Sequence, residues 1–309
     1  MLQTTIKRRI ECEGIGLHGG KMVRLVLRPA AEDTGIVFHV PGPHGVVDIF
    51  PTPDAVIATG LATTLGRGNA SVSTVEHLLA ALRGLGIDNV HVEAKGGEIP
   101  IMDGSAEPFV SLLQEAGIRY QQRYRRVLRI ARTVHFAEEG KSIVARPYDG
   151  FRVDCVIDFP HPSIGRQRMV LDVTPSSFAR IAAARTFGFA RDVQMLQERG
   201  LALGGSLDNA IALSDTGVLN EEGLRYADEF VRHKLLDFVG DMSMLPLPLQ
   251  GSFVVHCSGH ALNNRFLRHV ADNASSCLTE VNLGDSLVLD NAGPMRTMRG
   301  PVAAGAFAG

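Results

Sequence analysis

Short runs of β-branched and apolar residues, separated by turns, fill the first sixty positions of the chain. The runs VRLVL at 23–27 and IVFHV at 36–40 have strand composition, and PGPHG at 41–45 is typical of a turn. A further strand, VHVEA, is predicted at 90–94. The simplest arrangement of these runs is a small antiparallel sheet.

Two helical patterns accompany these strands. Apolar side chains recur at helical spacing over 74–85, and the Asp103-Gly104 turn precedes a second helix predicted over 105–116. Strands and helices together predict one α+β unit.

The second half of the chain repeats this order, with β-like runs at 142–146 and 152–159 and then helices and strands to about 272. The arginine-rich stretch 119–132 lies between the halves. It could form an anion-binding patch, but a solvated linker that runs into a strand is favoured. We therefore predict an α+β fold of two similar domains, each a small, mainly antiparallel sheet layered with helices. The predicted boundaries are 1–125 and 126–282, and the Gly-, Ala- and Pro-rich tail 283–309 is predicted to be disordered.

Composition narrows the classes of function. Hydrophobic residues make up 45% of the chain and charged residues 21%, which is ordinary globular composition. Thirty-one basic residues against thirty-three acidic ones give a formal charge of −2, so nucleic-acid binding through a global positive field is disfavoured.

Targeting signals and cysteine spacing bear on the cellular location and on the kind of metal site that the chain could form. The N-terminus lacks the pattern of a secretory signal, and no stretch approaches about 18 uninterrupted apolar residues. We expect a cytoplasmic protein without a transmembrane segment. The four cysteines are scattered and form no C-x-x-C pair, so any metal must be held by histidine and carboxylate.

The first segment with candidate catalytic or metal-binding residues is STVEHLLAALRGLG at 73–86. His77 points away from the apolar stripe of this helix, over a smooth face that holds Ala80, Ala81 and Gly84. Ser73 and Glu76 have the spacing of a capping box, and taken alone this structural role for Glu76 is favoured over a catalytic one.

A second candidate segment is the helix predicted over 220–242, with Asn220 as its N-cap. His233 and Asp237 are four residues apart, so both side chains project from one face, as two ligands of one metal require. Asp241 lies on the same face, opposite a predicted buried stripe that comprises Leu224, Ala227, Val231, Leu235, Phe238 and Met242. Exposed His–Asp pairs are common on helices, so the pair alone favours a solvated surface over a metal site.

His260 follows a glycine at the start of a third predicted helix, and by itself it fits either a turn histidine or a proton donor. When His260 is considered together with His77, His233 and Asp237, the four residues favour a catalytic metal that has three protein ligands and one open position. Glu76, adjacent to a ligand, would then act as the base.

Several strings resemble one known family, the zinc-dependent UDP-3-O-acyl-N-acetylglucosamine deacetylases of lipid A biosynthesis in Gram-negative bacteria. The resemblance spans about residues 3–281 and is carried by TVEHLLAALRGLGIDN, IPIMDGSAEPF, ARTFGF, RGLALGGSLDNAI and FVRHKLLDFVGD. It implies two domains that enclose the metal between them. It also implies a monomer that hydrolyses the N-acetyl group of a small-molecule acylated UDP-sugar.

The resemblance implies a role for each matching residue. The metal ligands would be His77, His233 and Asp237, which accept zinc or iron(II). Glu76 would be the general base, His260 the protonated partner, Asp241 the residue that orients His260, and Thr186 a holder of the oxyanion. Substrate contacts would come from Lys234, Phe187, Lys141 and Phe159. An inserted β-α-β element at about 187–207 would form the acyl-chain passage, lined by Val193, Ala202 and Gly205.

Two positions depart from what the resemblance leads us to expect. Cys257 stands where some relatives carry a basic residue that could help to neutralise the diphosphate, and the proline-rich LPLPLQ at 245–250 leaves the end of the preceding helix open.

Two alternative functions also remain at this point. The protein could be a zinc amidase for a different N-acyl sugar, or an RNA-binding or assembly module built on the same kind of layered unit.

Overall fold

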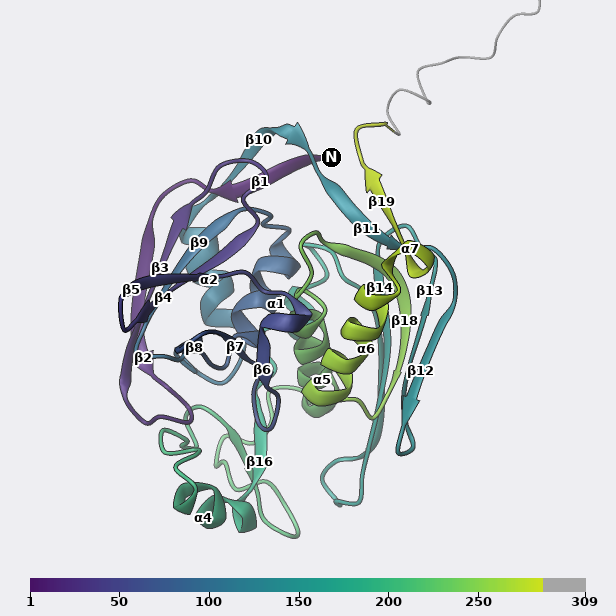
Figure 1. Ribbon diagram of the computed structural model, residues 1–309. Helices are drawn as coiled ribbons and strands as arrows, with labels where there is room; N and C mark the ends of the chain where they lie inside the picture. Colours follow the sequence, from purple (N-terminus) through teal and green to yellow (C-terminus); the bar gives the residue numbers. More distant parts are fainter. Residues whose placement is uncertain (286–309) are drawn as a thin grey trace, which may run out of the picture.

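The computed structural model describes residues 1–285. Its first layer is a five-stranded sheet (Figure 1), in which every neighbouring pair is antiparallel except β4 and β9. In spatial order the strands are β2 (Ile10–Ile15), β3 (Met22–Pro29), β9 (Val90–Lys95), β4 (Ile36–Gly42) and β5 (Gly45–Ile49).

Two smaller sheets complete the first half. β1 (Leu2–Ile6) pairs antiparallel with β10 (Ile118–Tyr124). A three-stranded sheet follows the 3-10 turn η1 (Pro53–Ala55) and is formed by β6 (Val56–Ala58), β7 (Thr64–Arg67) and β8 (Ala70–Val72).

The helices of this half are α1 (Glu76–Leu85) and α2 (Glu107–Ala116). Helix α1 ends because Gly86 adopts the left-handed conformation, with φ 72°, and its N–H bonds back to the carbonyls of the last turn. The apolar side chains of α1 are buried, as the helical spacing predicted, except that of Leu85, which is partly buried.

The second half is built on a seven-stranded sheet. Its main order is β12 (Val134–Glu138), β13 (Lys141–Arg146), β18 (Leu249–His256), β11 (Arg126–Ile130) and β19 (Leu278–Asn282). The strands β14 (Phe151–Phe159) and β15 (Gly165–Asp172) form an antiparallel pair beside β18.

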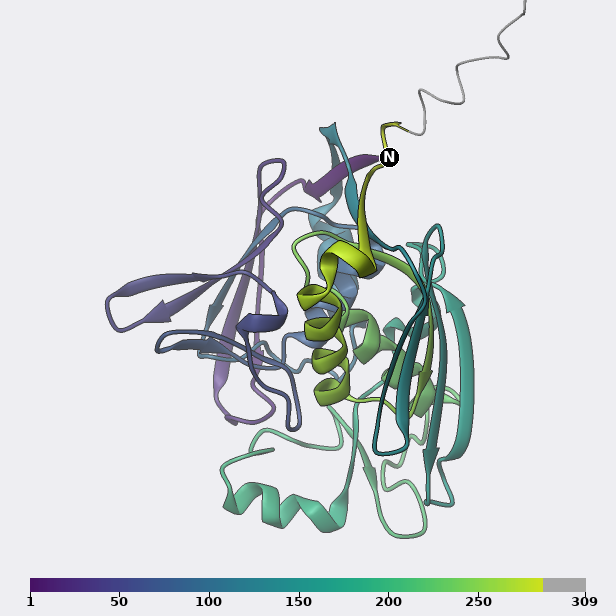
Figure 2. The ribbon, with the colours of Figure 1, turned by 45° about the vertical axis from the view of Figure 1, so that its right-hand side comes forward.

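Helices α5 (Glu229–Asp241) and α6 (His260–Asp272) of the second half lie between the two large sheets, as Figures 1 and 2 show. The short α3 (Ala179–Ala182) packs against α5, and the short α7 (Ala274–Cys277) packs against α6. Helices α1 and α5 pack directly on each other, and one continuous apolar core runs through both halves. The predicted α+β class, with helices layered on mainly antiparallel sheets, is confirmed.

An inserted β-α-β element projects from this body at the lower end of Figure 1. It consists of β16 (Phe187–Phe189), α4 (Ala190–Glu198) and β17 (Ile211–Leu213), and the two strands run parallel. The element therefore extends to Leu213, beyond the predicted end at about 207. No residue of α4 is buried.

The predicted helix over 220–242 was wrong in its first third, because α5 begins at Glu229. Asn220 does not cap a helix. Its side-chain oxygen accepts from Ala212 N, and its nitrogen donates to the carbonyls of Leu207 and Ala210. Ala227 is exposed, and α5 is buried on nearly every side rather than along one stripe.

The stretch 119–132 runs into a strand where the chain leaves the first half, as predicted, but the part before that strand was incorrectly predicted as a linker. The stretch forms most of β10 and all of β11, and the chain passes from one sheet to the other at Arg125, whose side chain is paired with Asp88 at 2.8 Å. The domain boundary at 125/126 stays a prediction. Positions 245–250 lie in the connection between α5 and β18 and in the start of β18.

Two further expectations concern the chain end and membranes. Residues 283–285 close the described chain, and the rest of the predicted disordered tail, 286–309, lies outside the described residues. Within residues 1–285 no helix is both long and apolar enough to cross a bilayer.

Candidate metal centre and active site

A cavity of about 340 Å³ opens where the two halves meet. Its walls come from α1, the start of α6, the middle of α5, the turn between β12 and β13, and the segment that enters β16. The lining includes Glu76, His77, Lys141, Thr186, Phe187, His233, Lys234, Asp237 and His260. Residues from both halves therefore contribute to one site.

Three predicted ligands lie together at the floor of this cavity. His77, His233 and Asp237 are all buried, and one ligand atom from each lies within 4.8 Å of the others. Asp237 Oδ1 is 3.3 Å from His233 Nε2 and 3.6 Å from His77 Nε2. This oxygen has no hydrogen-bond partner, although it is buried. A buried carboxylate oxygen without a donor, facing two imidazoles, fits a divalent cation of the type that imidazole and carboxylate bind.

The protonation states suit such a cation. Burial lowers the pKa of His233 to about 3, despite the nearby Asp237 carboxylate, so this imidazole is neutral at pH 7. Burial opposes the charge of Asp237, but the charged Lys234 amine and the charged His260 imidazole hold its pKa well below the ordinary value. A neutral imidazole and an ionised carboxylate are the forms that bind metals.

Neighbouring groups fix the orientation of these ligands. The Nδ1 of His233 lies 3.0 Å from the carbonyl oxygen of Ala184, so the ring donates there and keeps its Nε2 lone pair for the site. Lys234 Nζ donates to Asp237 Oδ2 at 2.9 Å. Burial works against the charge of Lys234, yet Asp237 raises its pKa, so the amine remains protonated.

Glu76 and His260 face each other beside the triad. His260 Nε2 lies 3.8 Å from Glu76 Oε1 and 3.9 Å from Asp237 Oδ2. Burial raises the pKa of Glu76, and His260 partly opposes that shift. The arrangement brings a carboxylate with a raised pKa and an imidazole close to the candidate metal position, which is the pairing that acid–base catalysis requires.

His260 is held by a second carboxylate. Its Nδ1 lies 2.8 Å from Asp241 Oδ2, and although burial opposes the charged form, Asp241 raises the pKa of His260 to about 10. Asp241 also accepts from Thr63 Oγ1 at 2.8 Å and from Asn263 Nδ2 at 2.8 Å. The histidine is therefore protonated at pH 7.

The capping-box interpretation of Glu76 was wrong. The position before α1 is Val75, and no side chain caps the helix. Ser73 Oγ instead lies 3.0 Å from Thr64 Oγ1, and Glu76 Oε2 accepts from the backbone N–H of Thr63 at 3.0 Å. The carboxylate is thus turned into the cavity.

The predicted substrate residues divide into two groups. Lys141, Thr186, Phe187 and Lys234 line the cavity, and Lys234 Nζ sits 5.3 Å from the centre of the Phe187 ring. Phe159 packs edge-on against Phe187, with ring centres 5.6 Å apart, but it is not among the lining residues.

Val193, Ala202 and Gly205 are not among the residues of the described chain that line this cavity. The insertion nevertheless touches the cavity wall. Gly204 N donates to the carbonyl of Leu17 at 2.9 Å, and Leu17 lines the cavity. Exposed apolar side chains gather on the insertion, namely Val193, Met195, Leu203 and Leu207.

Sequence reasoning missed Thr63 and Arg265. Thr63 contacts both Glu76 and Asp241, but no local pattern marks it, because its position depends on how its loop folds. Arg265 lines the cavity and pairs with Glu138 at 2.5 Å. No local pattern marks Arg265 either, because five residues along a helix turn a side chain about 140° away from that of His260.

A buried His–His–Asp cluster with an adjacent Glu–His pair, enclosed by a layered α+β fold, defines a metal-dependent hydrolase. The family described as UDP-3-O-acyl N-acetylglycosamine deacetylase matches residues 3–272, and the chain belongs to this family.

Relatives from three bacteria agree with this assignment, and each is named UDP-3-O-acyl-N-acetylglucosamine deacetylase. The protein from Nitratidesulfovibrio vulgaris is 65% identical over 283 residues, 92% of each chain. That from Oleidesulfovibrio alaskensis is 58% identical over 305 residues, 98% of this chain and 100% of the relative. That from Lawsonia intracellularis is 54% identical over 280 residues, 90% and 92% of the two chains.

Proposed function

We propose that the chain hydrolyses the N-acetyl group of UDP-3-O-(3-hydroxyacyl)-N-acetylglucosamine, giving acetate and the free 2-amino sugar nucleotide, the committed step of lipid A biosynthesis. One observation carries the proposal. His77, His233 and Asp237 converge in one cavity with Glu76 and His260, in a chain of the deacetylase family. Four unpaired cysteines, two of them buried, are consistent with a reducing compartment, which supports a cytoplasmic location.

We further propose that the resident metal is zinc, held by His77, His233 and Asp237, with iron(II) as an alternative that the same donor atoms accept. When bound, such a metal polarises a carbonyl oxygen and lowers the pKa of water toward neutrality. The unpartnered Asp237 Oδ1 and the neutral His233 ring support this assignment.

Glu76 is the proposed general base. It takes a proton from the attacking water as the new C–O bond forms at the acetyl carbonyl. Its position beside the triad and its single backbone donor, Thr63 N, leave Oε1 free to face the reacting water. Because burial raises the pKa of Glu76, the protonated form is accessible after the transfer.

His260 is the proposed general acid. Asp241 keeps its imidazole protonated, so Nε2–H can donate to the amine nitrogen as the C–N bond breaks. Thr186, which also lines the cavity, is the proposed donor to the oxyanion. The carboxylates of Glu76 and Asp241 thus have different tasks. Glu76 accepts a proton, and Asp241 holds the protonated His260 in place.

The remaining substrate contacts are proposed from their place around the cavity. Lys234 and Lys141 would meet the sugar nucleotide, and Arg265 supplies a further positive charge in the lining of the cavity. Phe187 and, behind it, Phe159 provide apolar surface. The exposed apolar side chains of the insertion support the proposal that it contacts the acyl chain.

Deacetylation of acylated and unacylated UDP-N-acetylglucosamine, assayed side by side, tests this function. We expect release of acetate from the acylated substrate, loss of activity after chelation, and recovery on adding Zn²⁺. Faster hydrolysis of a different N-acyl sugar would assign the site to another substrate. Release of acetate that is insensitive to chelation would contradict the metal.

A further inference from the structure

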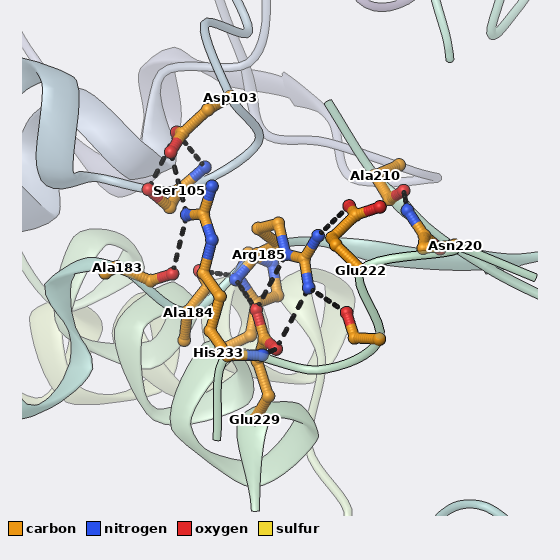
Figure 3. A network of polar contacts seen from close by, with 12 residues as sticks. Asp103, Ser105, Ala183, Ala184, Arg185, Ala210, Asn220, Glu222, Glu229 and His233 are labelled. Atoms are coloured by element: carbon orange, nitrogen blue, oxygen red, sulfur yellow. Dashed lines mark hydrogen bonds and ion pairs between the residues drawn. The ribbon is translucent and has the colours of Figure 1, made fainter. Parts of the chain in front are cut away.

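The segment 183–186, which joins α3 to β16, is held by a polar contact at each of its four residues. The Ala183 carbonyl accepts from Arg225 Nη1 at 3.0 Å, and the Ala184 carbonyl accepts from His233 Nδ1 at 3.0 Å. Thr186 N donates to Gly104 O at 2.8 Å. Figure 3 shows how this segment lies between α5 and the Asp103 turn.

Arg185 makes the densest of these contacts. Its side chain is 2% exposed and that of its partner Glu229 is fully buried. Glu229 Oε1 accepts from Arg185 Nε at 2.9 Å and also from the Arg185 backbone N–H at 3.0 Å. The remaining guanidinium nitrogens reach the carbonyl of Gly223 at 2.7 Å and Glu222 Oε1 at 2.8 Å.

The spacing along α5 connects this ion pair to the candidate metal ligands. Glu229 and His233 are four residues apart, so they stand on one face of the helix in successive turns. Their partners, Arg185 and Ala184, are neighbours in the chain. Two adjacent residues of the segment are therefore attached to two adjacent turns of α5, and this fixes the Ala184 carbonyl opposite the His233 ring.

Stability alone gives a weak reason for a charged pair at this position. Replacing a buried ion pair by apolar side chains of similar volume is often neutral or stabilising. A carbonyl that accepts the second N–H of a metal-binding histidine, by contrast, sets the tautomer and orientation of the ring. The next residue, Thr186, lines the cavity, so the same attachment also places that hydroxyl-bearing residue.

We propose that Arg185 and Glu229 are positioning residues for the active site, acting through the Ala184 carbonyl on His233 and through the chain on Thr186. The inference rests on the proposed function, because it takes His233 as a metal ligand. Neither side chain is among the residues that line the cavity, so their effect is exerted through these neighbours.

The test uses the full chain with Glu229→Gln, which keeps the shape of the side chain and removes its charge. Zn²⁺ affinity is measured by competition with a chelator, and the His233 imidazole is followed by ¹⁵N NMR in the metal-free protein. We expect Zn²⁺ affinity and kcat each to fall about 10- to 100-fold, as typical for partners of metal ligands, with little change in KM. The His233 Nδ1–H signal should shift or exchange with solvent.

Two further variants separate positioning from folding. Glu222 is the outer partner of Arg185, and its own side chain is 59% exposed. Glu222→Gln removes this exposed charge and should leave the Zn²⁺ affinity within about twofold of that of the unaltered protein. The double variant Arg185→Met with Glu229→Met leaves no unpaired buried charge, so it should fold and still lose Zn²⁺ affinity.

Two results would overturn the proposal. In the first, Glu229→Gln or the double variant folds and keeps both its Zn²⁺ affinity and its His233 signal. In the second, Glu222→Gln loses as much Zn²⁺ affinity as Glu229→Gln. If the unaltered chain binds no Zn²⁺, the proposed function fails, whereas the imidazole signal in metal-free protein still decides the positioning role.

Discussion

Gly240 of α5 lies directly against the backbone of Glu76 in α1. A Cβ atom at position 240 would come within 2.1 Å of the Glu76 carbonyl oxygen, a distance that no real side chain tolerates. The two helices that carry the candidate ligands therefore approach each other as closely as they do because residue 240 has no side chain.

Gly240→Ala should consequently separate α1 from α5. Overpacking of a buried contact costs about 1–3 kcal/mol, and a collision with backbone falls at the upper end. We expect a lower midpoint of denaturant unfolding together with lost deacetylase activity. Gly217→Ala, where a Cβ meets nothing within 4 Å, is the matched control. Unchanged stability in Gly240→Ala would mean that the helices can shift apart freely.

His233→Ala should abolish stoichiometric metal binding and activity together, because it removes one of three ligands. Metal content of freshly purified protein, measured by elemental analysis, checks the prediction. His135→Ala, at an exposed position on β12, should keep the metal. Full metal content in His233→Ala would remove that residue from the ligand set.

Glu76→Gln and His260→Ala should each lower kcat by about 10²–10⁴-fold while the metal stays bound, since both residues are proposed to move protons rather than to ligate. The pH–rate profile should lose its acid limb in the first variant and its alkaline limb in the second. Glu115→Gln, at an exposed position, serves as the control. Profiles that keep both limbs in both variants would contradict the division of labour.

Asp241→Asn should change how stability depends on pH. In the folded protein the pKa of His260 is raised to about 10, above the ordinary 6.5, with Asp241 as the group that overcomes burial. The contribution to stability is therefore fully present below about pH 6.5 and is lost as the pH rises through 10.

The free energy of unfolding of the unaltered protein minus that of Asp241→Asn should thus be larger at pH 6 than at pH 10. The alkaline limb of the rate profile should also move to lower pH in the variant. Denaturant titrations at both pH values provide the measurement, with Asp228→Asn, which loses an ion pair to Arg232 at the start of α5, as the control. An equal difference at both pH values would mean that Asp241 does not hold the imidazolium.

Gly205→Phe should reject long acyl chains. A Cβ at this position would stand 3.3 Å from the Ala202 carbonyl oxygen and 3.7 Å from Leu17, a residue of the cavity wall, so a bulky ring would crowd the wall of the proposed acyl passage. Each buried methylene is worth about 0.8 kcal/mol, so kcat/KM of the unaltered enzyme should rise with acyl length. In Gly205→Phe, kcat/KM should stop rising at a shorter acyl length, while the metal content stays that of the unaltered protein. The control Gly217→Phe should show the same dependence on acyl length as the unaltered protein. Parallel curves would place the passage elsewhere.

Local spacing predicted the geometry of one part of the site but not its function. His233 and Asp237 stand four apart, and that spacing alone puts them on one helix face. Spacing cannot connect His77 to them, since this contact forms across the two halves, and here the family resemblance supplied what periodicity could not.

Two of the errors share one physical cause, because polar side chains found tertiary partners instead of local ones. Asn220 bonds to a loop rather than capping a helix, and Glu76 accepts from Thr63 rather than from its own first turn. Arg185 gave no signal at all, because arginine is ordinarily exposed and its buried partner lies 44 positions further along the chain.

The bond from Thr63 to Asp241 joins positions 178 residues apart. During synthesis the first half would leave the ribosome with Glu76 and His77 but without His233 and Asp237, the other two proposed ligands. An incomplete chain would then offer a single imidazole to the proposed metal. Capture of that metal would require translation to have passed α5, and we expect a product truncated before α5 to bind no metal and to have no activity.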